Sequence, residues 1–272
     1  MGKIIFLDID GTIRDFDGYI PDTTIDAIKI ARRNGHKVCI STGRTYGQIE
    51  ERVKEIGFDG IVSGSGSYVE YEGKRVRYEY FEPIKYTQLC EYLRKNKCIF
   101  QMQSFQGLYI IKEQLDEFSN IMNRIQKSLG LEAREISMLP TVIECTMEVE
   151  KIEKILFFSD ELSNEKLLKD WGQDLYVVPH SIPNASKWGG EITPIHVNKA
   201  EGIRSILQQS EYIEADVIAI GDSENDIEML KMASVGIAMG NGAQKIKNAA
   251  DLITDSVRED GIKKAFQKLD LI

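Results

Sequence analysis

Residues 3–12 read KIIFLDIDGT, and this stretch decides both the fold and the chemistry expected of the chain. Its four apolar residues, Ile4 to Leu7, are typical of a strand that is covered on both faces, as in a parallel sheet. Asp8 and Asp10 follow at once, separated only by Ile9. Two carboxylates at the end of a buried strand repel each other and lose hydration, so another group must compensate their charge.

The composition of the 272 residues is that of an ordinary globular protein, with 42% hydrophobic and 28% charged residues. The net charge of −9 argues against a nucleic-acid partner. No apolar stretch approaches the roughly 20 residues that span a bilayer. The N-terminus shows no basic-then-apolar signal segment, so we expect no membrane partner and a cytoplasmic location. The oligomeric state does not follow from the sequence.

The positions of the histidines and cysteines limit the kinds of metal site that this protein can form. The three histidines are scattered without the spacing of a zinc site, and the four cysteines contain no C-x-x-C pair. We therefore interpret the cysteines as reduced thiols. Any metal in this protein would have to be held by oxygen.

Strand and helix patterns alternate at both ends of the chain. A helix is expected from Pro21-Asp22 onward and a buried strand at Lys37–Ile40. Ser41-Thr-Gly-Arg44 would follow this strand and lead to a helix that ends at Ile56. The segment Glu72-Gly73-Lys74 has the composition of a hairpin turn. A further buried strand is expected at Asp216–Ile220, beyond a long middle segment of different character.

That middle segment combines helices and strands in an order that predicts an α+β unit with an antiparallel sheet. We therefore expect an α/β fold with two domains. Residues 1–82 and 190–272 would form a doubly wound, mainly parallel, Rossmann-like core sheet. Residues 83–189 would form an inserted α+β cap domain of about a hundred residues, large enough to fold as a unit.

Parallel sheets bind their ligands at the carboxyl ends of their strands, and several polar groups are expected there. The second strand delivers Thr42, Gly43 and Arg44, and a later one delivers Gly221-Asp222-Ser223-Glu224-Asn225-Asp226. Asp222, Asn225 and Asp226 are spaced i, i+3 and i+4, so they share one side of a helical turn.

Two acidic strand ends that face each other form an oxygen-only site for a hard cation, and Mg²⁺ fits it. The cation would cancel the repulsion between Asp8, Asp10 and Asp222 and would give a phosphate group a place to bind. A carboxylate at this position can attack phosphorus, and a second one can protonate the leaving oxygen. Thr42 and Gly43 can hold phosphate oxygens, and Lys199 can stabilise the charge of the transition state. Arg44 either contacts substrate or pairs with a core carboxylate.

The strings FLDIDGTI, STGR, VNKAEGI and GDSENDIEML, in this order, resemble the four motifs of the haloacid dehalogenase-like (HAD) phosphatases. The later AMGNG, ADLIT and DGIKKAF resemble the Cof-type branch, which carries a large α/β cap. The resemblance covers both core segments. It implies that the cap selects the substrate.

By this resemblance Asp8 is the nucleophile and Asp10 the general acid and base. Mg²⁺ would be bound by Asp8, the backbone carbonyl of Asp10, and Asp222. Thr42 and Asn225 would hold the phosphoryl group. Lys199 would offset charge at the nucleophile, and Asp226 would support the metal or the lysine. The usual Asn-Gly-Ala after the third strand reads Ser65-Gly66-Ser67 here, which removes any contact made by that asparagine.

Each motif alone has an ordinary structural explanation, since Asp-x-Asp and Gly-Asp-x-x-Asn-Asp also suit turns and helix starts. Together and in order they favour a Mg²⁺-dependent phosphatase that acts on a small phosphorylated metabolite, such as a sugar phosphate, through an aspartyl-phosphate. A phosphomutase or phosphotransferase would use the same intermediate. A non-catalytic sensor of a phosphorylated ligand would have no need of Asp10, and a haloacid dehalogenase proper would need neither Asp10 nor the metal.

Overall fold

A computed structural model describes residues 2–129, 140–146, 149–179 and 186–272. The chain forms two compact units, one made of residues 1–44, 49–78 and 198–272, the other of residues 45–48 and 79–197. Within the described ranges, no helix combines the length and the apolar character needed to cross a membrane.

The first unit is built on an eight-stranded sheet. In spatial order its strands are β14 (Leu252–Ile253), β13 (Val235–Ala238), β12 (Val217–Gly221), β1 (Ile4–Leu7), β2 (Lys37–Ser41), β3 (Gly60–Ser63), β4 (Tyr68–Tyr71) and β5 (Lys74–Tyr78). The strands from β14 to β3 are parallel, whereas β4 and β5 form an antiparallel hairpin at one edge. The doubly wound, mainly parallel α/β fold expected from the sequence is therefore confirmed.

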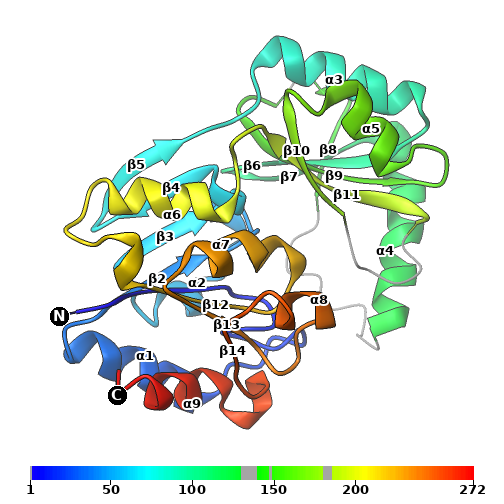
Figure 1. Cartoon of the computed structure of the whole chain (residues 1–272). Coiled ribbons are helices and arrows are strands. Elements are labelled where there is room, and N and C mark those ends of the chain that lie inside the picture. The colour runs from blue at the N-terminus through cyan, green and yellow to red at the C-terminus, as the bar shows by residue number, and fades with distance from the viewer. Residues whose placement is uncertain (1, 130–139, 147–148, 180–185) are drawn as a thin grey trace. The chain divides into compact units, whose positions relative to one another are not determined.

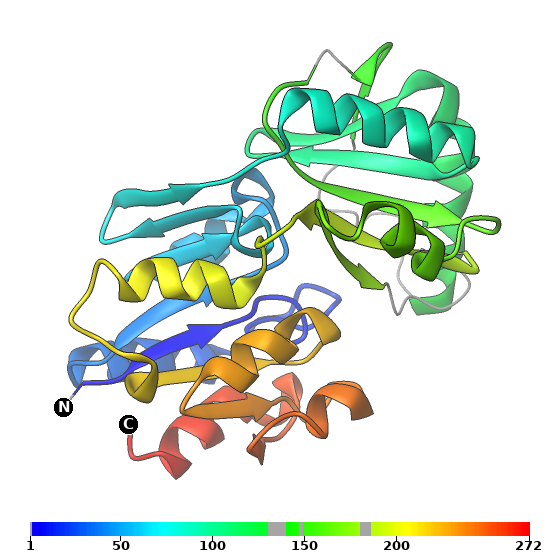
Figure 2. The ribbon, with the colours of Figure 1, turned by 45° about the horizontal axis from the view of Figure 1, so that its top comes forward.

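Side chains of β1 alternate between two apolar cores, which explains why this strand contains no polar residue. Ile5 and Leu7 belong to the core beneath α1 (Asp22–Arg33) and α9 (Gly261–Lys268). Ile4 and Phe6 belong to the core on the other face. That face is covered by α6 (Lys199–Leu207), α7 (Ile227–Met232) and α8 (Gln244–Lys247), and the two layers of helices can be followed in Figure 1 and Figure 2.

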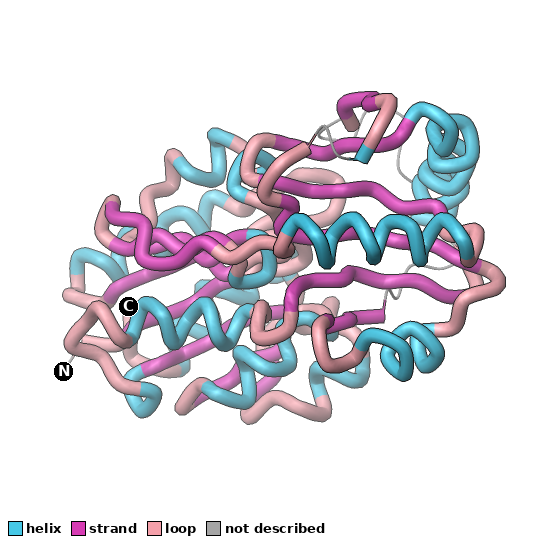
Figure 3. The backbone as a smooth tube through the Cα atoms, turned by 90° about the horizontal axis from the view of Figure 1, so that it is seen from above, coloured by secondary structure: helices cyan, strands magenta, loops and turns pink. Residues whose placement is uncertain are grey.

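The second unit contains a six-stranded sheet. Its spatial order is β10 (Leu175–Pro179), β11 (Trp188–Pro194), β9 (Ile152–Ser159), β6 (Ile99–Ser104), β7 (Gly107–Ile111) and β8 (Thr141–Ile143). All neighbours are antiparallel except β7 and β8. The helices α3 (Pro83–Lys95) and α5 (Asn164–Trp171) contribute to one core of this unit and α4 (Leu115–Leu129) to the other, and Figure 3 distinguishes these helices from the strands by colour.

Two expectations from the sequence change in detail. Trp188–Pro194 is a strand of the second sheet, paired with β9 and β10, so the first unit resumes at residue 198 and not at 190. The helix expected up to Ile56 is broken into a 3₁₀ turn at Tyr46–Gln48 and the short α2 (Glu51–Lys54). The turn is held in the second unit, because the Gly47 amide donates to the Phe105 carbonyl and the rings of Tyr46 and Phe105 stack.

Candidate active site

The carboxyl ends of three neighbouring strands bring the predicted site residues together. β1 lies between β12 and β2, in register, so Asp8, Asp222 and Thr42, which directly follow these strands, meet at one edge of the sheet. The Asp8 amide donates to the Ile220 carbonyl at 3.0 Å, which continues the pairing up to the first carboxylate. The sheet topology therefore produces the site.

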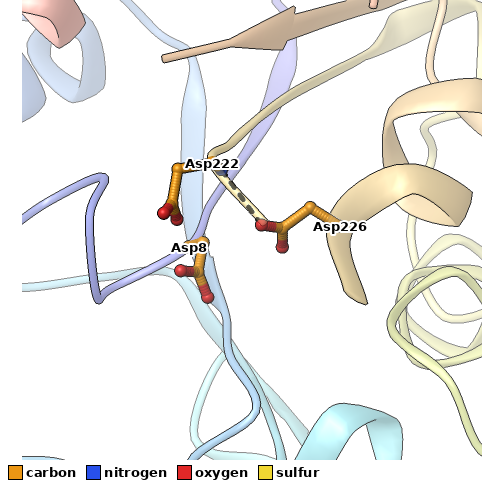
Figure 4. Close-up of side chains that lie close together, drawn as sticks. All are labelled: Asp8, Asp222 and Asp226. Atoms are coloured by element: carbon orange, nitrogen blue, oxygen red, sulfur yellow. Dashed lines mark hydrogen bonds between the residues drawn. The ribbon is translucent and has the colours of Figure 1, made fainter. Parts of the chain in front are cut away.

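Three buried carboxylates form an acidic cluster at this edge. Asp8, Asp222 and Asp226 each offer an oxygen, and these oxygens lie within 4.8 Å of one another (Figure 4). Asp222 approaches the loop after β1 so closely that a Cβ on Gly11 would lie 2.3 Å from its Oδ2. Gly11 also has a φ of +79°, so both its conformation and its neighbour require glycine.

Lys199 is the cation of this cluster. Its ammonium lies 2.6 Å from Asp8 Oδ1 and 2.5 Å from Asp226 Oδ1, and only 1% of the residue is exposed. It is the first residue of α6, whose N-cap Asn198 accepts a hydrogen bond from the Glu201 amide at 2.9 Å. A capped helix start therefore holds a lysine far away in the sequence against the nucleophile candidate.

Asp226 contacts several protein donors. Its Oδ2 accepts hydrogen bonds from the backbone amides of Asp222 and Ser223, and its Oδ1 faces Lys199. This arrangement ties the start of the helical turn after β12 to Lys199.

The cluster shifts the acidity of its members. Burial raises the pKa of Asp8 to about 7; Lys199 opposes this rise, while Asp226 and Asp10 add to it. Burial and then the repulsion of Asp8 and Asp226 raise the pKa of Asp222 to about 9. For Lys199, burial favours a lower pKa, but Asp226 and Asp8 outweigh it, so its pKa is raised. One buried ammonium therefore does not neutralise the cluster, and a bound divalent cation fits a set of hard oxygen donors with excess negative charge.

Asp10 lies outside the acidic cluster, unlike the arrangement expected from the sequence. Its carboxylate is held by Arg44, with Nε 2.6 Å from Oδ2 and Nη2 2.9 Å from Oδ1. The Arg14 Nε lies 3.0 Å from the same Oδ1. Arginines therefore compensate the charge of Asp10, and of the two roles considered for Arg44 the structure shows the pairing with a core carboxylate.

The expected phosphate-binding residues line neighbouring loops. Thr42 is buried after β2, and its Oγ1 accepts a hydrogen bond from the Arg44 amide at 3.2 Å across Gly43. Asn225 lies in the turn after β12, where its Oδ1 accepts from the Ser223 hydroxyl at 2.7 Å. Ser65 has a left-handed φ of 57°, and its amide donates to the Thr42 carbonyl, so it braces the loop that carries Thr42.

The sequence did not single out three residues that shape the site. Thr12 Oγ1 donates to Asp222 Oδ1 at 3.5 Å. Asn241 Nδ2 donates to the Gly11 carbonyl at 2.8 Å, while its Oδ1 accepts from the Val257 amide. Arg14 reaches Asp10. The string AMGNG marks Asn241, but no local pattern shows that Thr12 and Arg14 turn toward the carboxylates.

Comparison with known proteins places this geometry in a family. A model of haloacid dehalogenase-like hydrolases matches residues 5–266. The chain belongs to the haloacid dehalogenase-like hydrolases. The resemblance to HAD phosphatases, inferred from the four motifs, and to their Cof-type branch, inferred from the later strings, is confirmed, and with it the expectation of an HAD-type phosphatase.

Relatives of this HAD protein match it along its length. The 5-amino-6-(5-phospho-D-ribitylamino)uracil phosphatase YcsE of Bacillus subtilis (strain 168) is 28% identical over 267 residues, which cover 97% of this chain and 94% of YcsE. A protein of Geobacillus kaustophilus HTA426 of known crystal structure is 29% identical, with a TM-score of 0.81 and complete coverage of both chains. The sugar phosphatase BT4131, of HAD subclass IIB, shares the fold with a TM-score of 0.80 at 23% identity, covering 99% of this chain and 100% of its own.

Proposed function

We propose that this protein is a Mg²⁺-dependent phosphatase that hydrolyses a small phosphorylated metabolite, such as a sugar phosphate, through an aspartyl-phosphate on Asp8. The observation that carries the proposal is the pairing of the buried Asp8 with Lys199 beside Asp222. A purely structural carboxylate gains nothing from burial beside two others, whereas a nucleophile that must meet a phosphate dianion needs compensating charge.

Mg²⁺ would be held by Asp8, Asp222 and the backbone carbonyl of Asp10, as in the family. The fit rests on the donor set, because the two carboxylates have raised pKa values and offer hard oxygen ligands close to each other. When bound, the ion supplies Lewis-acid polarisation of the phosphoryl oxygens and offsets the charge of the acidic cluster.

The residues of the chain then have separate roles in two steps. The Asp8 carboxylate attacks phosphorus and forms the new P–O bond, the bond to the leaving oxygen breaks, and Asp10 gives that oxygen a proton. In the second step Asp10 takes a proton from water, the water oxygen bonds to phosphorus, and the acyl-phosphate bond breaks to restore Asp8. Lys199 stabilises the negative charge in both steps, and Thr42, Gly43 and Asn225 hold the phosphoryl oxygens.

We propose further that the second unit is the cap that selects the substrate. Support comes from its separate cores and from the named activity of YcsE, which acts on a phosphorylated ribityl compound. A phosphate ester of a small polyol or sugar is therefore the first class to test.

The deciding experiment is phosphate release from p-nitrophenyl phosphate, measured with Mg²⁺ and with EDTA, for the wild type and Asp8→Asn. We expect release only when both Mg²⁺ and Asp8 are present, with a loss of at least about a thousandfold in Asp8→Asn because the nucleophile is missing. Without Mg²⁺ the variant should unfold at a temperature no lower than the wild type, because the amide removes a buried charge.

Full activity of Asp8→Asn would refute the mechanism. Wild-type enzyme that isomerises a sugar phosphate without net release of phosphate would instead identify a mutase.

A further inference from the structure

Arg14 is brought to Asp10 by the turn that follows β1. The Arg14 amide donates to the Ile9 carbonyl at 2.9 Å, and the Gly11 amide donates to the Arg14 carbonyl at 2.7 Å. Asp10 and Arg14 also form an isolated backbone bridge. The turn therefore folds back on itself and fixes the start of the Arg14 side chain, which is 8% exposed.

Two arginines grip the Asp10 carboxylate. Arg44 donates a hydrogen bond to each oxygen. Arg14 adds a second cation, with its Nε 3.0 Å from Oδ1 in an ion pair that is not a hydrogen bond. The carboxylate remains 30% exposed and is joined to the backbone beside Gly11, so without these contacts it would be able to rotate about two bonds. A bidentate arginine fixes the plane of a carboxylate, and a second contact limits its remaining motion.

Glu50 holds the second arginine in place. Its Oε1 accepts a hydrogen bond from Arg14 Nη1 and lies 3.6 Å from Arg44 Nη1. Burial acts to raise the pKa of Glu50, but Arg52, Arg14 and Arg44 outweigh it and lower the pKa, so Glu50 remains a carboxylate. A chain of ion pairs therefore runs from Glu50 through Arg14 to Asp10.

We propose that Arg14, anchored by Glu50, is a positioning residue that holds Asp10 in the orientation needed to protonate the leaving oxygen. This inference rests on the proposed function of Asp10. Proton transfer requires a heavy-atom distance of about 2.6–3.2 Å, so a carboxylate left free to rotate would spend much of its time out of reach. Arg14 itself need not touch the substrate.

The test compares substrates that depend differently on the acid. The phenolate leaving group of an aryl phosphate departs without a proton, whereas the alkoxide leaving group of an alkyl phosphate requires one. A misoriented Asp10 should therefore slow the hydrolysis of an alkyl phosphate more than that of an aryl phosphate. We would measure kcat/KM for p-nitrophenyl phosphate and for the most rapidly hydrolysed sugar phosphate of a panel. In Arg14→Met the ratio of the sugar phosphate value to the aryl value should fall by about 10-fold to 100-fold. Arg14→Lys should restore part of the ratio.

Three further variants make the result decisive. Glu50→Gln keeps both arginines but removes the charge that anchors Arg14, so it should lower the same ratio. It tests the inference independently if Arg14→Met does not fold. Arg52→Met is the matched control, because Arg52 also binds Glu50, at 2.5 Å, whereas the described ion pairs of Asp10 are with Arg14 and Arg44. This variant should leave the ratio unchanged. Asp10→Asn gives the fall in the ratio that results from complete loss of the acid. As a check on the metal site, the Mg²⁺-induced rise in Tm should be the same in Arg14→Met as in the wild type.

An unchanged ratio in both Arg14→Met and Glu50→Gln, with a large fall in Asp10→Asn, would overturn the inference and leave the proposed function intact. An equal fall in Arg52→Met would also overturn it, since the effect would then be general. An Asp10→Asn variant with an unchanged ratio would overturn both.

Discussion

At the scale of single residues, Asp8 and Asp10 are near neighbours in sequence with different electrostatic surroundings. Asp8 points into a buried cluster with Asp222 and Lys199, whereas Asp10 is held by arginines at a more exposed position. Alternation along an extended chain would place both side chains on one side of the strand. The turn after Ile9 breaks that alternation, and this separates the candidate nucleophile from the candidate acid.

Stability in the absence of metal should depend on pH through two carboxylates. The pKa of Asp8 rises from 3.8 to about 7 and that of Asp222 from 3.8 to about 9, so the folded protein retains protons that the unfolded chain has released. The free energy of unfolding should be highest below about pH 4 for these groups and should fall as the pH rises through about 7 and then about 9.

A divalent cation should restore the stability lost at high pH, because it replaces the protons that Asp8 and Asp222 release. We expect the rise in Tm on addition of Mg²⁺ to be at least about 3 °C larger at pH 9 than at pH 5. Thermal unfolding with EDTA and with Mg²⁺ at both pH values measures it, and Asp222→Asn should weaken the trend. Equal Mg²⁺ effects at the two pH values would contradict the assignment of these carboxylates to a cation site.

At the scale of elements, the position of α6 decides where Lys199 lies. The helix approaches β3 and the turn after it very closely: a Cβ on Gly202 would lie 2.4 Å from Val62 Cγ1, and one on Gly66 would lie 2.2 Å from the Asn198 carbonyl oxygen. Asn198 is the N-cap of α6, so this contact fixes the position of the backbone at Lys199, the first residue of the helix. Small residues at the contact thus allow the ammonium to reach Asp8.

Gly66→Ala should therefore harm both stability and activity. Gly66 has a φ of +103°, and Gly73, in the exposed hairpin turn, has a φ of +74° with no atom near its missing Cβ. Gly73→Ala should cost only the conformational strain, about 1–2 kcal/mol. Gly66→Ala adds a backbone clash and should cost at least about 1 kcal/mol more, with reduced kcat.

Urea unfolding and phosphate release from both variants check this difference. Equal destabilisation of the two variants would show that α6 can shift without cost.

At the scale of the whole molecule, each apolar core lies within one unit. The two cores of the first unit flank its parallel sheet, and the two cores of the second unit flank its antiparallel sheet. The proposed Mg²⁺ ligands all belong to the first unit. Stabilisation by the cation should therefore be confined to the elements that carry those ligands.

Hydrogen exchange measures this confinement. Mg²⁺ should slow exchange in β1 and β12 by about tenfold or more, because it stabilises the ends of these strands against local opening. Exchange in β6 and β9 of the second unit should not change. A uniform slowing across both sheets would show that the two units open together, contrary to their separate cores.

The parallel core, the inserted unit and the residues at the strand ends could all be predicted from the amino-acid sequence. These follow from local patterns, since a continuous apolar run predicts a buried strand and the carboxyl ends of neighbouring parallel strands must meet. The meeting of Asp8 and Asp222 was predictable for the same reason, whereas the place of Lys199 depends on how α6 packs. The boundary at Trp188–Pro194 was not, because a strand pattern does not say which sheet the strand joins.

Which carboxylates share a cluster, and which are held by arginines, became clear from the folded structure alone. The separation of Asp10 from Asp8 depends on the turn at Gly11. The position of Arg14 depends on Glu50, which lies in another loop. Ion pairs between loops leave no periodic signal in a sequence, because the direction of each side chain is fixed by packing and not by spacing. The sequence thus determined which strand ends meet, and the conformation of the loops decided which charges face each other there.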